Sequence, residues 1–248
     1  RVEVVCRKVE DLTDRSGLLH VDPDRRAGAS KRAVRVEDYV PDLDVLRRFV
    51  AEFRGGAVKV SPAANFGGKF DDVEIELVSL YGEAKEATIW FGDLAEPDLW
   101  RATVLPEGAT LAGDPLAAEP ALSELRGHLF DPDPAVVRAG LVDLLCAETG
   151  LTRLDAAEEY LTADEPVATP FAVGFRVVAE LPNNERAVRK YLREANVGRL
   201  EIKARRLPVD VERLHRTLPT PGERPAVLIF ARIAGKARAV VAERLEQA

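Results

Sequence analysis

The sequence predicts an α/β chain that opens with a parallel sheet and ends with a compact α+β module. Residues 1–105 alternate short strand patterns with a helical pattern, which is typical of a parallel sheet with helices packed on it. Residues 173–248 combine amphipathic helices with a strictly alternating strand and a terminal pair of strands. Between them, residues 106–126 are rich in Ala, Pro, Gly and Glu and are interpreted as a connector, and 127–172 as a small helical unit.

In the first part, apolar and β-branched runs predict five strands around one helix. The helix over 41–53 places its apolar side chains on one face and is followed by Gly55-Gly56, which ends it. Two strands meet at the turn Tyr81-Gly82, which predicts an antiparallel hairpin at the edge of the sheet. The expected strands cover residues 2–6, 17–22, 57–62, 73–77 and 87–91.

In the rest of the chain, Asp133 and Pro134 have the residue types of a helix start, and the predicted helix ends at Gly150. A short helix is expected over 155–161. The last module is predicted to follow the order strand, helix, strand, helix, strand, strand. Its elements are expected over 175–179, 184–195, 199–205, 210–218, 226–233 and 237–242.

Composition favours a soluble cytoplasmic protein without a metal site. The chain has 248 residues, 46% of them hydrophobic, and no apolar run approaches the roughly 20 residues of a membrane helix. Its two cysteines stand far apart, and its three histidines form no ligand cluster. Because the sequence contains no Met and opens inside a strand pattern, we interpret it as a fragment of a longer protein.

Charge is distributed unevenly along the chain. Residues 182–248 hold 15 Lys and Arg against 8 Asp and Glu, a net charge of +7, whereas the whole chain carries -7. The rest therefore carries -14. A basic terminal module on an acidic body suggests a polyanionic partner for that module. Arg189, Lys190, Lys203 and Arg205 are predicted to point outward and to bind phosphate, with an ordinary solvated face as the alternative.

The strand over 17–22 ends in the motif Asp22-Pro23-Asp24-Arg25-Arg26. A strand that ends in Asp-Pro places a carboxylate at the carboxyl edge of a parallel sheet, where open α/β sheets bind ligands. Arg25 and Arg26 are candidates to grip a phosphate or carboxylate of a substrate. A turn with solvated charges is the alternative.

Two further motifs are expected near this edge. Lys59 and Ser61 belong to a second strand that ends in a polar-Pro turn, and Lys59 is a candidate to bind the substrate. Glu83 and Lys85 follow the turn at Tyr81 and are candidates for a substrate-binding wall, unless they are only paired surface charges.

Several stretches, taken in order, resemble class I S-adenosylmethionine-dependent methyltransferases that carry a THUMP-like C-terminal domain. These stretches are Asp22-Pro23-Asp24-Arg25-Arg26, Tyr39-Val40-Pro41-Asp42-Leu43, Val58-Lys59-Val60-Ser61-Pro62, Ser79-Leu80-Tyr81-Gly82-Glu83-Ala84-Lys85-Glu86 and Glu201-Ile202-Lys203-Ala204-Arg205. The resemblance implies a partial Rossmann-like sheet over 1–105, a small ferredoxin-like insert over 127–172 and a THUMP-like domain over 173–248. It also implies S-adenosylmethionine as methyl donor and RNA, tRNA included, as substrate, although a fold does not fix a function.

In this family, Asp22, Pro23 and Ser61 would position the nucleophile. Asp24 and Arg25 depart from the family pattern, which has a second proline and an aromatic residue at these places and which suits methylation of a base amine. Asp22 and Glu10 are the residues that would contact the cofactor, although position 8, where an acidic residue is expected, is Lys8.

The family's Gly-rich cofactor loop has no counterpart, because no G-x-G-x-G occurs in the sequence. We therefore expect this chain by itself to be unable to bind the cofactor. The alternatives are a non-catalytic RNA-binding or scaffold module and a methyltransferase acting on protein or a small molecule.

Overall fold

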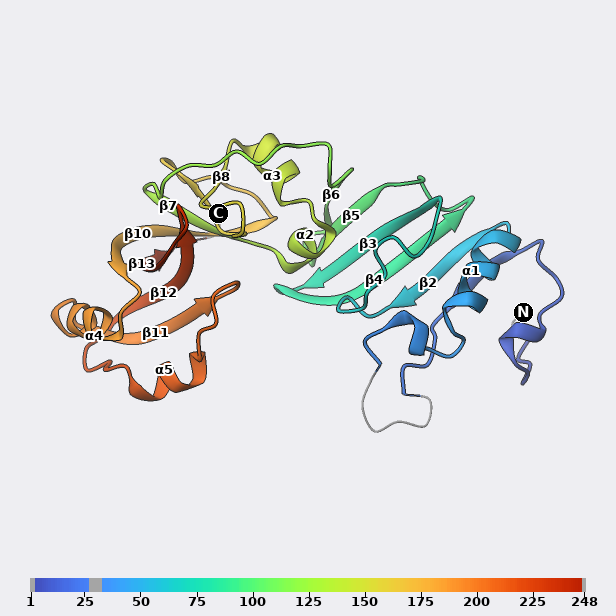
Figure 1. Ribbon diagram of the computed structural model, residues 1–248, viewed down its shortest axis with the longest axis horizontal. Helices are drawn as coiled ribbons and strands as arrows, with labels where there is room; N and C mark the ends of the chain where they lie inside the picture. Colours follow the sequence, from blue (N-terminus) through green and yellow to red (C-terminus); the bar gives the residue numbers. More distant parts are fainter. Residues whose placement is uncertain (1–2, 27–32, 247–248) are drawn as a thin grey trace. The chain divides into compact units, whose positions relative to one another are not determined.

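The computed structural model describes residues 3–26 and 33–246 of the chain (Figure 1). The chain divides into two compact units. The first contains residues 1–115 and 134–141, and the second contains residues 116–133 and 142–248. Each unit is built on its own sheet, with six strands in the first and seven in the second.

The sheet of the first unit has the order β1-β2-β4-β3-β5-β6. Strands β1, β2, β3 and β5 run in one direction, and β4 and β6 run in the other. The carboxyl ends of the first four therefore meet at one edge of the sheet. The strands are β1 (Leu18–Val21), β2 (Gly55–Val60), β3 (Val73–Leu80), β4 (Glu83–Gly92), β5 (Trp100–Leu105) and β6 (Ala109–Gly113).

Alternation along these strands gives the sheet one apolar and one polar face. Buried Val58, Leu77 and Ile89 belong to the apolar face. On the other face, Glu76 accepts hydrogen bonds from the Trp90 indole at 2.9 Å and from the Thr103 hydroxyl at 2.6 Å. The polar face therefore carries an ordered side-chain network.

Two α-helices and two short 3-10 turns complete the first unit. The helices are α1 (Leu43–Glu52), which contacts β2, and α2 (Pro134–Ala139), which contacts β3, β4 and β5. The turns are η1 (Val9–Asp11) and η2 (Val36–Asp38). The side chain of Asp42 accepts a hydrogen bond from the Val45 amide at 3.1 Å and so caps α1.

The structure corrects several expectations for this part. Residues 3–6 form no strand, and Val4 is 91% exposed, as a segment without a partner strand would be. The β3–β4 hairpin lies inside the sheet, because β5 and β6 extend the sheet beyond β3. Those two strands were missed, and β6 lies in the expected connector. Pro41 precedes the cap of α1 instead of starting the helix.

The sheet of the second unit has the order β11-β12-β13-β10-β7-β9-β8. Its strands are β7 (His128–Pro132), β8 (Thr152–Arg153), β9 (Leu161–Ala163), β10 (Ala172–Pro182), β11 (Val197–Ala204), β12 (Arg224–Ile233) and β13 (Lys236–Arg244). Its helices are α3 (Val142–Thr149), α4 (Glu185–Glu194) and α5 (Val211–Thr217).

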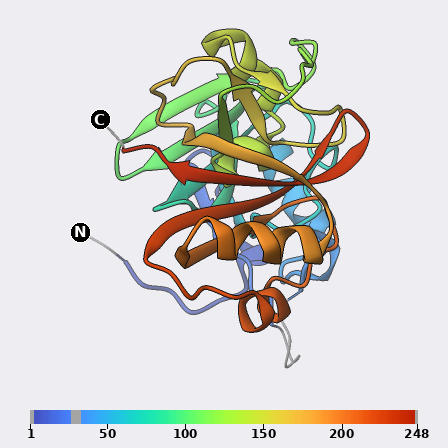
Figure 2. The same cartoon turned by 90° about the vertical axis from the view of Figure 1, so that its left-hand side faces the viewer.

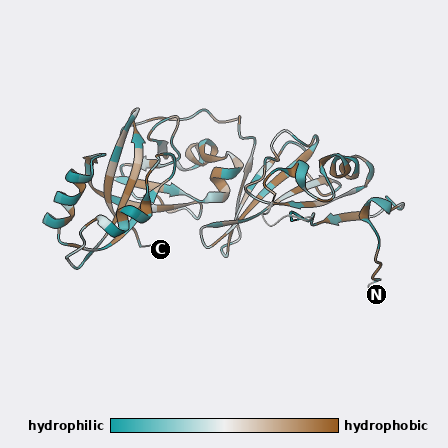
Figure 3. Cartoon of the chain, turned by 60° about the horizontal axis from the view of Figure 1, so that its bottom comes forward, coloured by the Kyte–Doolittle hydropathy of each residue, from teal (hydrophilic) through white to brown (hydrophobic). Residues whose placement is uncertain are grey.

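Helices α4 and α5 pack on one face of this sheet, as Figure 2 shows. Val188 and Leu192 of α4 and Leu214 of α5 are buried there against Leu228 and Phe230. The outward side of α4 is hydrophilic, whereas the strands are largely hydrophobic (Figure 3). The opposite face of the sheet has its own buried cluster, which includes Tyr160, Phe175, Ile229 and Val240.

Expectations for residues 127–172 are also corrected. This segment contributes β7, β8 and β9 to the same sheet as residues 173–248, so it is not a separate small insert. The helix expected to run unbroken to Gly150 is interrupted at Gly140, whose φ is 74°, and its halves α2 and α3 belong to different units. No helix forms over 155–161, where Glu158 and Tyr160 are buried instead.

Candidate functional site at the carboxyl edge and on helix α4

Three charged side chains come together at the carboxyl edge of the first sheet. Asp22 directly follows β1, Lys59 lies on the neighbouring strand β2, and Glu86 lies on β4 next to it. The Lys59 ammonium nitrogen lies 3.2 Å from Glu86 Oε2 and 3.7 Å from Asp22 Oδ2. The sequence thus placed Asp22 and Lys59 at one edge, and it considered Glu86 only as part of the cluster Glu83-Ala84-Lys85-Glu86.

The two carboxylates keep Lys59 charged. The hydrogen bond to Glu86 raises the pKa of Lys59 above its usual value, and the charges of Glu86 and Asp22 raise it further. Lys59 is therefore a fixed cation at neutral pH and is no proton acceptor.

The loops beside this edge are held by their own contacts. The Ser61 amide donates to the hydroxyl of buried Tyr39 at 3.4 Å. Asn65 accepts a hydrogen bond from the Val36 amide at 3.0 Å and so joins the loop after β2 to η2. Arg138 of α2 donates to the carbonyl of Pro62 at 2.5 Å and lies over the Phe66 ring.

An ion pair also joins the loop after β2 to η2. Glu37 on η2 accepts a hydrogen bond from the Lys69 ammonium, which lowers the pKa of Glu37 to about 2. The carboxyl edge is thus built from two loops that are fastened to each other.

The remaining residues predicted for this edge do not all meet there. Pro23 is buried and Arg26 is exposed, and no described contact involves either of the Arg25 and Arg26 guanidinium groups. Glu83 and Lys85 pair with each other at the start of β4. None of the described contacts joins either of them to Asp22.

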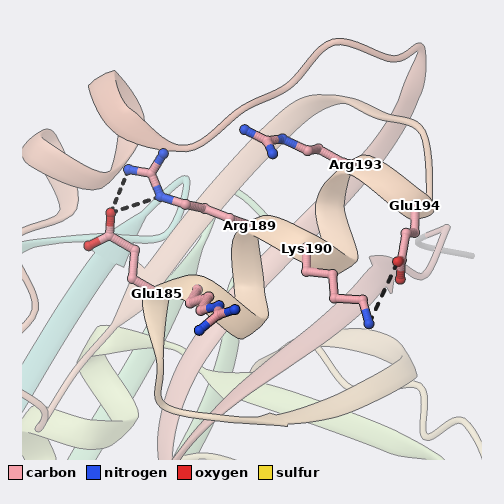
Figure 4. Close-up of a pocket in the computed structure, with 6 residues that line it drawn as sticks. Glu185, Arg189, Lys190, Arg193 and Glu194 are labelled. Carbon is pink, nitrogen blue, oxygen red and sulfur yellow. Dashed lines mark hydrogen bonds and ion pairs between the residues drawn. The ribbon is translucent and has the colours of Figure 1, made fainter.

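In the second unit, Arg189 and Lys190 lie on the outward side of α4 (Figure 4). Arg189 pairs with Glu185 at 2.6 Å, and Lys190 approaches Glu194 at 3.8 Å. Arg193 points away from Glu194 in Figure 4. Within the described part of the chain, no ion pair is formed by Arg186 or Arg193, so α4 presents unneutralised positive charge.

Lys203 and Arg205 do not belong to this surface, which corrects the prediction that they point outward beside Arg189 and Lys190. Lys203 Nζ lies 3.0 Å and Arg205 Nε 2.7 Å from the carboxylate of buried Asp131 on β7. Three strands separate β7 from β11, so this ion triplet indicates a strongly curved sheet. Their alternation with Ile202, which packs in the cluster under α4, places them on the opposite face.

Parts of the chain match known proteins. Residues 172–244 match the family described as THUMP domain-like. An uncharacterised S-adenosylmethionine-dependent methyltransferase of Mycobacterium tuberculosis, in strains CDC 1551 and H37Rv, is 32% identical over 224 residues. The chain is therefore similar to proteins named as S-adenosylmethionine-dependent methyltransferases, and its residues 172–244 match a THUMP-like domain. The match covers 88% of the chain but 61% of the mycobacterial proteins, so the chain spans about three fifths of their length.

A solved structure shares the fold of this chain. It is the crystal structure of a candidate methyltransferase from Porphyromonas gingivalis W83, with a TM-score of 0.74 and 18% sequence identity. The match covers 92% of our chain and 60% of the other. The comparisons confirm the resemblance that was inferred from the sequence.

The two residues expected to contact the methyl donor do not form a joint site. Asp22 lies at the carboxyl edge with 62% of its side chain exposed, whereas Glu10 lies on η1. None of the described contacts links the two. Of the two residues expected to contact the cofactor, only Asp22 lies at the carboxyl edge. The described residues therefore fit the cofactor only in part.

Three residues that shape the edge were missed by sequence reasoning. They are Tyr39, Asn65 and Arg138. Glu86 belongs to a predicted cluster, but the register that pairs Lys59 with Thr88 and brings Glu86 to Lys59 cannot be read from the sequence. Arg138 lies in a helix that was expected to belong to a later unit, so nothing pointed to it.

Two other features, a membrane-spanning helix and a metal site, were sought in residues 3–26 and 33–246. This part of the chain has no helix with the length and apolar character needed to cross a membrane. It also has no group of three His, Cys, Asp or Glu side chains arranged to hold a metal ion.

Proposed function

We propose that the intact protein transfers the methyl group of S-adenosylmethionine to RNA, tRNA being the first candidate. One observation carries this proposal: the chain is similar to methyltransferases and also contains a THUMP-like domain. Helix α4 of that domain presents unneutralised cations. The cofactor would supply the methyl group. Asp22 would accept a hydrogen bond from the nucleophile, with Pro23 and Ser61 shaping the turns beside it.

RNA would dock on the outward side of α4. Arg186, Lys190 and Arg193 follow one another at intervals of four and three residues, so they line one side of the helix. Phosphate contacts are electrostatic and release counterions, which makes binding depend on salt. The cations on the opposite face are poorer candidates because Lys203 pairs with Asp131 and Glu201, and Arg205 pairs with Asp131.

The docking step is tested by changing these three residues to Glu together. Affinity for bulk tRNA should fall, and the slope of log K against log salt should flatten by about 2 to 3, since each phosphate contact contributes about 0.7 to 0.9. The matched control carries the same charge change at Arg199, Arg216 and Lys236, which are exposed outside α4 in the same unit. An unchanged affinity in the α4 variant, or an equal loss in the control, would count against docking on α4.

The reaction itself is tested with the intact protein, tritiated S-adenosylmethionine and total RNA. Label in RNA is expected, and it should disappear in Asp22→Ala. Label in protein or small molecules alone would replace the RNA substrate by one of those classes. Absence of any label with every substrate would favour a non-catalytic RNA-binding or scaffold module.

A further inference from the structure

We infer that Lys59 is a positioning residue, fixed by Glu86, that orients Asp22 as the hydrogen-bond acceptor for a donor group on the substrate's nucleophile. This inference rests on the proposed function. It assigns Lys59 a different role from the substrate-binding cation that the sequence suggested, and it gives Glu86 a part in the site.

The supporting contacts form an unbroken chain from the sheet to the exposed carboxylate. The hydroxyl of Thr88, a buried residue, donates to Glu86 Oε1 at 3.1 Å. The other oxygen of Glu86 lies 3.2 Å from the Lys59 ammonium. Because Glu86 and Thr88 share β4 and Lys59 pairs with Thr88 across β2 and β4, the backbone ladder fixes these positions.

The contact between Lys59 and Asp22 is of a different kind. Lys59 Nζ and Asp22 Oδ2 are 3.7 Å apart, which is too far for a hydrogen bond. The ammonium therefore restrains the direction of the carboxylate through charge attraction. The side chain of Lys59 is 39% exposed and that of Asp22 is 62% exposed, so Asp22 is the more accessible of the two. Asp22 thus remains able to accept a hydrogen bond while its direction is restrained.

The net charge of Asp22, Lys59 and Glu86 determines which substrate group can bind beside Asp22. Two carboxylates and one ammonium leave a net charge of about -1 at the three side chains. A substrate phosphate or carboxylate bound to Lys59 would have to compete with Glu86 and approach Asp22. A neutral amine or hydroxyl that donates a hydrogen bond meets no such cost.

Steady-state kinetics of the intact protein separate orientation from binding. Lys59→Met should lower kcat by about 10- to 100-fold with little change in KM, because misplacing a positioned group slows the chemical step. Lys59→Arg, which keeps the charge, should recover most of kcat, and Glu86→Gln should lie between. Lys236→Met in the second unit is the matched control. A raised KM with unchanged kcat in Lys59→Met would overturn the inference and return Lys59 to the role of a substrate-binding cation.

A second readout does not depend on methyl transfer. Reductive methylation with ¹³C-formaldehyde gives each lysine an NMR signal, and the Lys59 signal is assigned by its loss in Lys59→Arg. Its pKa should lie above that of exposed lysines and should fall in Glu86→Gln, and to a smaller extent in Asp22→Asn. If neither variant moves the Lys59 titration, the contact network is refuted whatever the substrate. If wild type labels no RNA but the titration moves as expected, the proposed function fails and the network stands.

Discussion

Asp131 on β7 is predicted to be one of the main determinants of stability in the second unit. Its carboxylate is 10% exposed and accepts hydrogen bonds from Lys203 at 3.0 Å and from Arg205 at 2.7 Å. In Asp131→Ala both cations lose that partner while they remain three-quarters buried. Removing one partner of a fully buried ion pair costs about 3 to 5 kcal/mol, so with this residual exposure we expect a loss of about 2 to 3 kcal/mol.

Urea denaturation followed by far-UV circular dichroism measures this loss. Asp131→Asn keeps an acceptor oxygen and should lose less than Asp131→Ala. The matched control is Glu194→Ala, whose exposed pair with Lys190 should contribute less than about 0.5 kcal/mol. If Asp131→Ala costs no more than this control, the ion triplet does not stabilise the curved sheet.

This prediction also decides how RNA binding is to be probed. Changing Lys203 and Arg205 to Glu would place three carboxylates together inside the unit. A loss of RNA binding in that variant would report unfolding, because like charges at close range are strongly destabilising in a partly buried site.

Three further predictions concern the first unit and the cofactor. A methyl group at Gly56 would lie 2.0 Å from the Leu19 carbonyl oxygen. Gly56→Ala should therefore destabilise the β1–β2 pair by about 3 kcal/mol in thermal melts. The matched Gly67→Ala, whose methyl group would have its nearest neighbour at 3.9 Å, should be close to neutral. Because Lys69 lowers the pKa of Glu37 to about 2 from 4.5, the stability that this pair contributes is present above pH 4.5 and is lost as the pH falls toward 2. Melts of Glu37→Gln should lack that part of the acid dependence, and identical acid profiles would contradict the ion pair. Calorimetric titration of this chain with S-adenosylmethionine should give no tight binding, and tight binding would show that the Gly-rich loop is dispensable.

The sequence predicts the elements of this fold better than their arrangement. Periodicity located α1, α4 and α5 to within a few residues, because the apolar face of a helix is a local signal. Asn184 and Asp210, where the predicted α4 and α5 begin, are the N-caps of these helices. The turn at Tyr81 is also predicted by local residue types, and Tyr81 has a positive φ.

Long-range pairing accounts for most of the differences. Nothing local indicates that β4 is inserted between β2 and β3, or that β7 joins the sheet of β10 to β13. Gly140 splits one apolar helical pattern into helices of two units, and a pattern of side chains does not reveal that break.

The candidate site follows the same rule. Asp22 was found because Asp-Pro after a strand is a local motif, whereas its link to Lys59 and Glu86 depends on strand order and register. The alternating pattern of the sequence predicts that Lys203 and Arg205 point outward. The curvature of the sheet instead brings Asp131 against them, 72 residues from Lys203 and 74 residues from Arg205 along the chain.

The central claim is that the intact protein methylates RNA, and mass spectrometry of nucleosides tests it most directly. RNA from a strain that lacks the gene is digested and compared, class by class, with RNA from the parent strain. We predict that one methylated nucleoside is absent, that the wild-type gene restores it, and that a gene encoding Asp22→Ala does not. An unchanged set of methylated nucleosides in every RNA class would contradict the account.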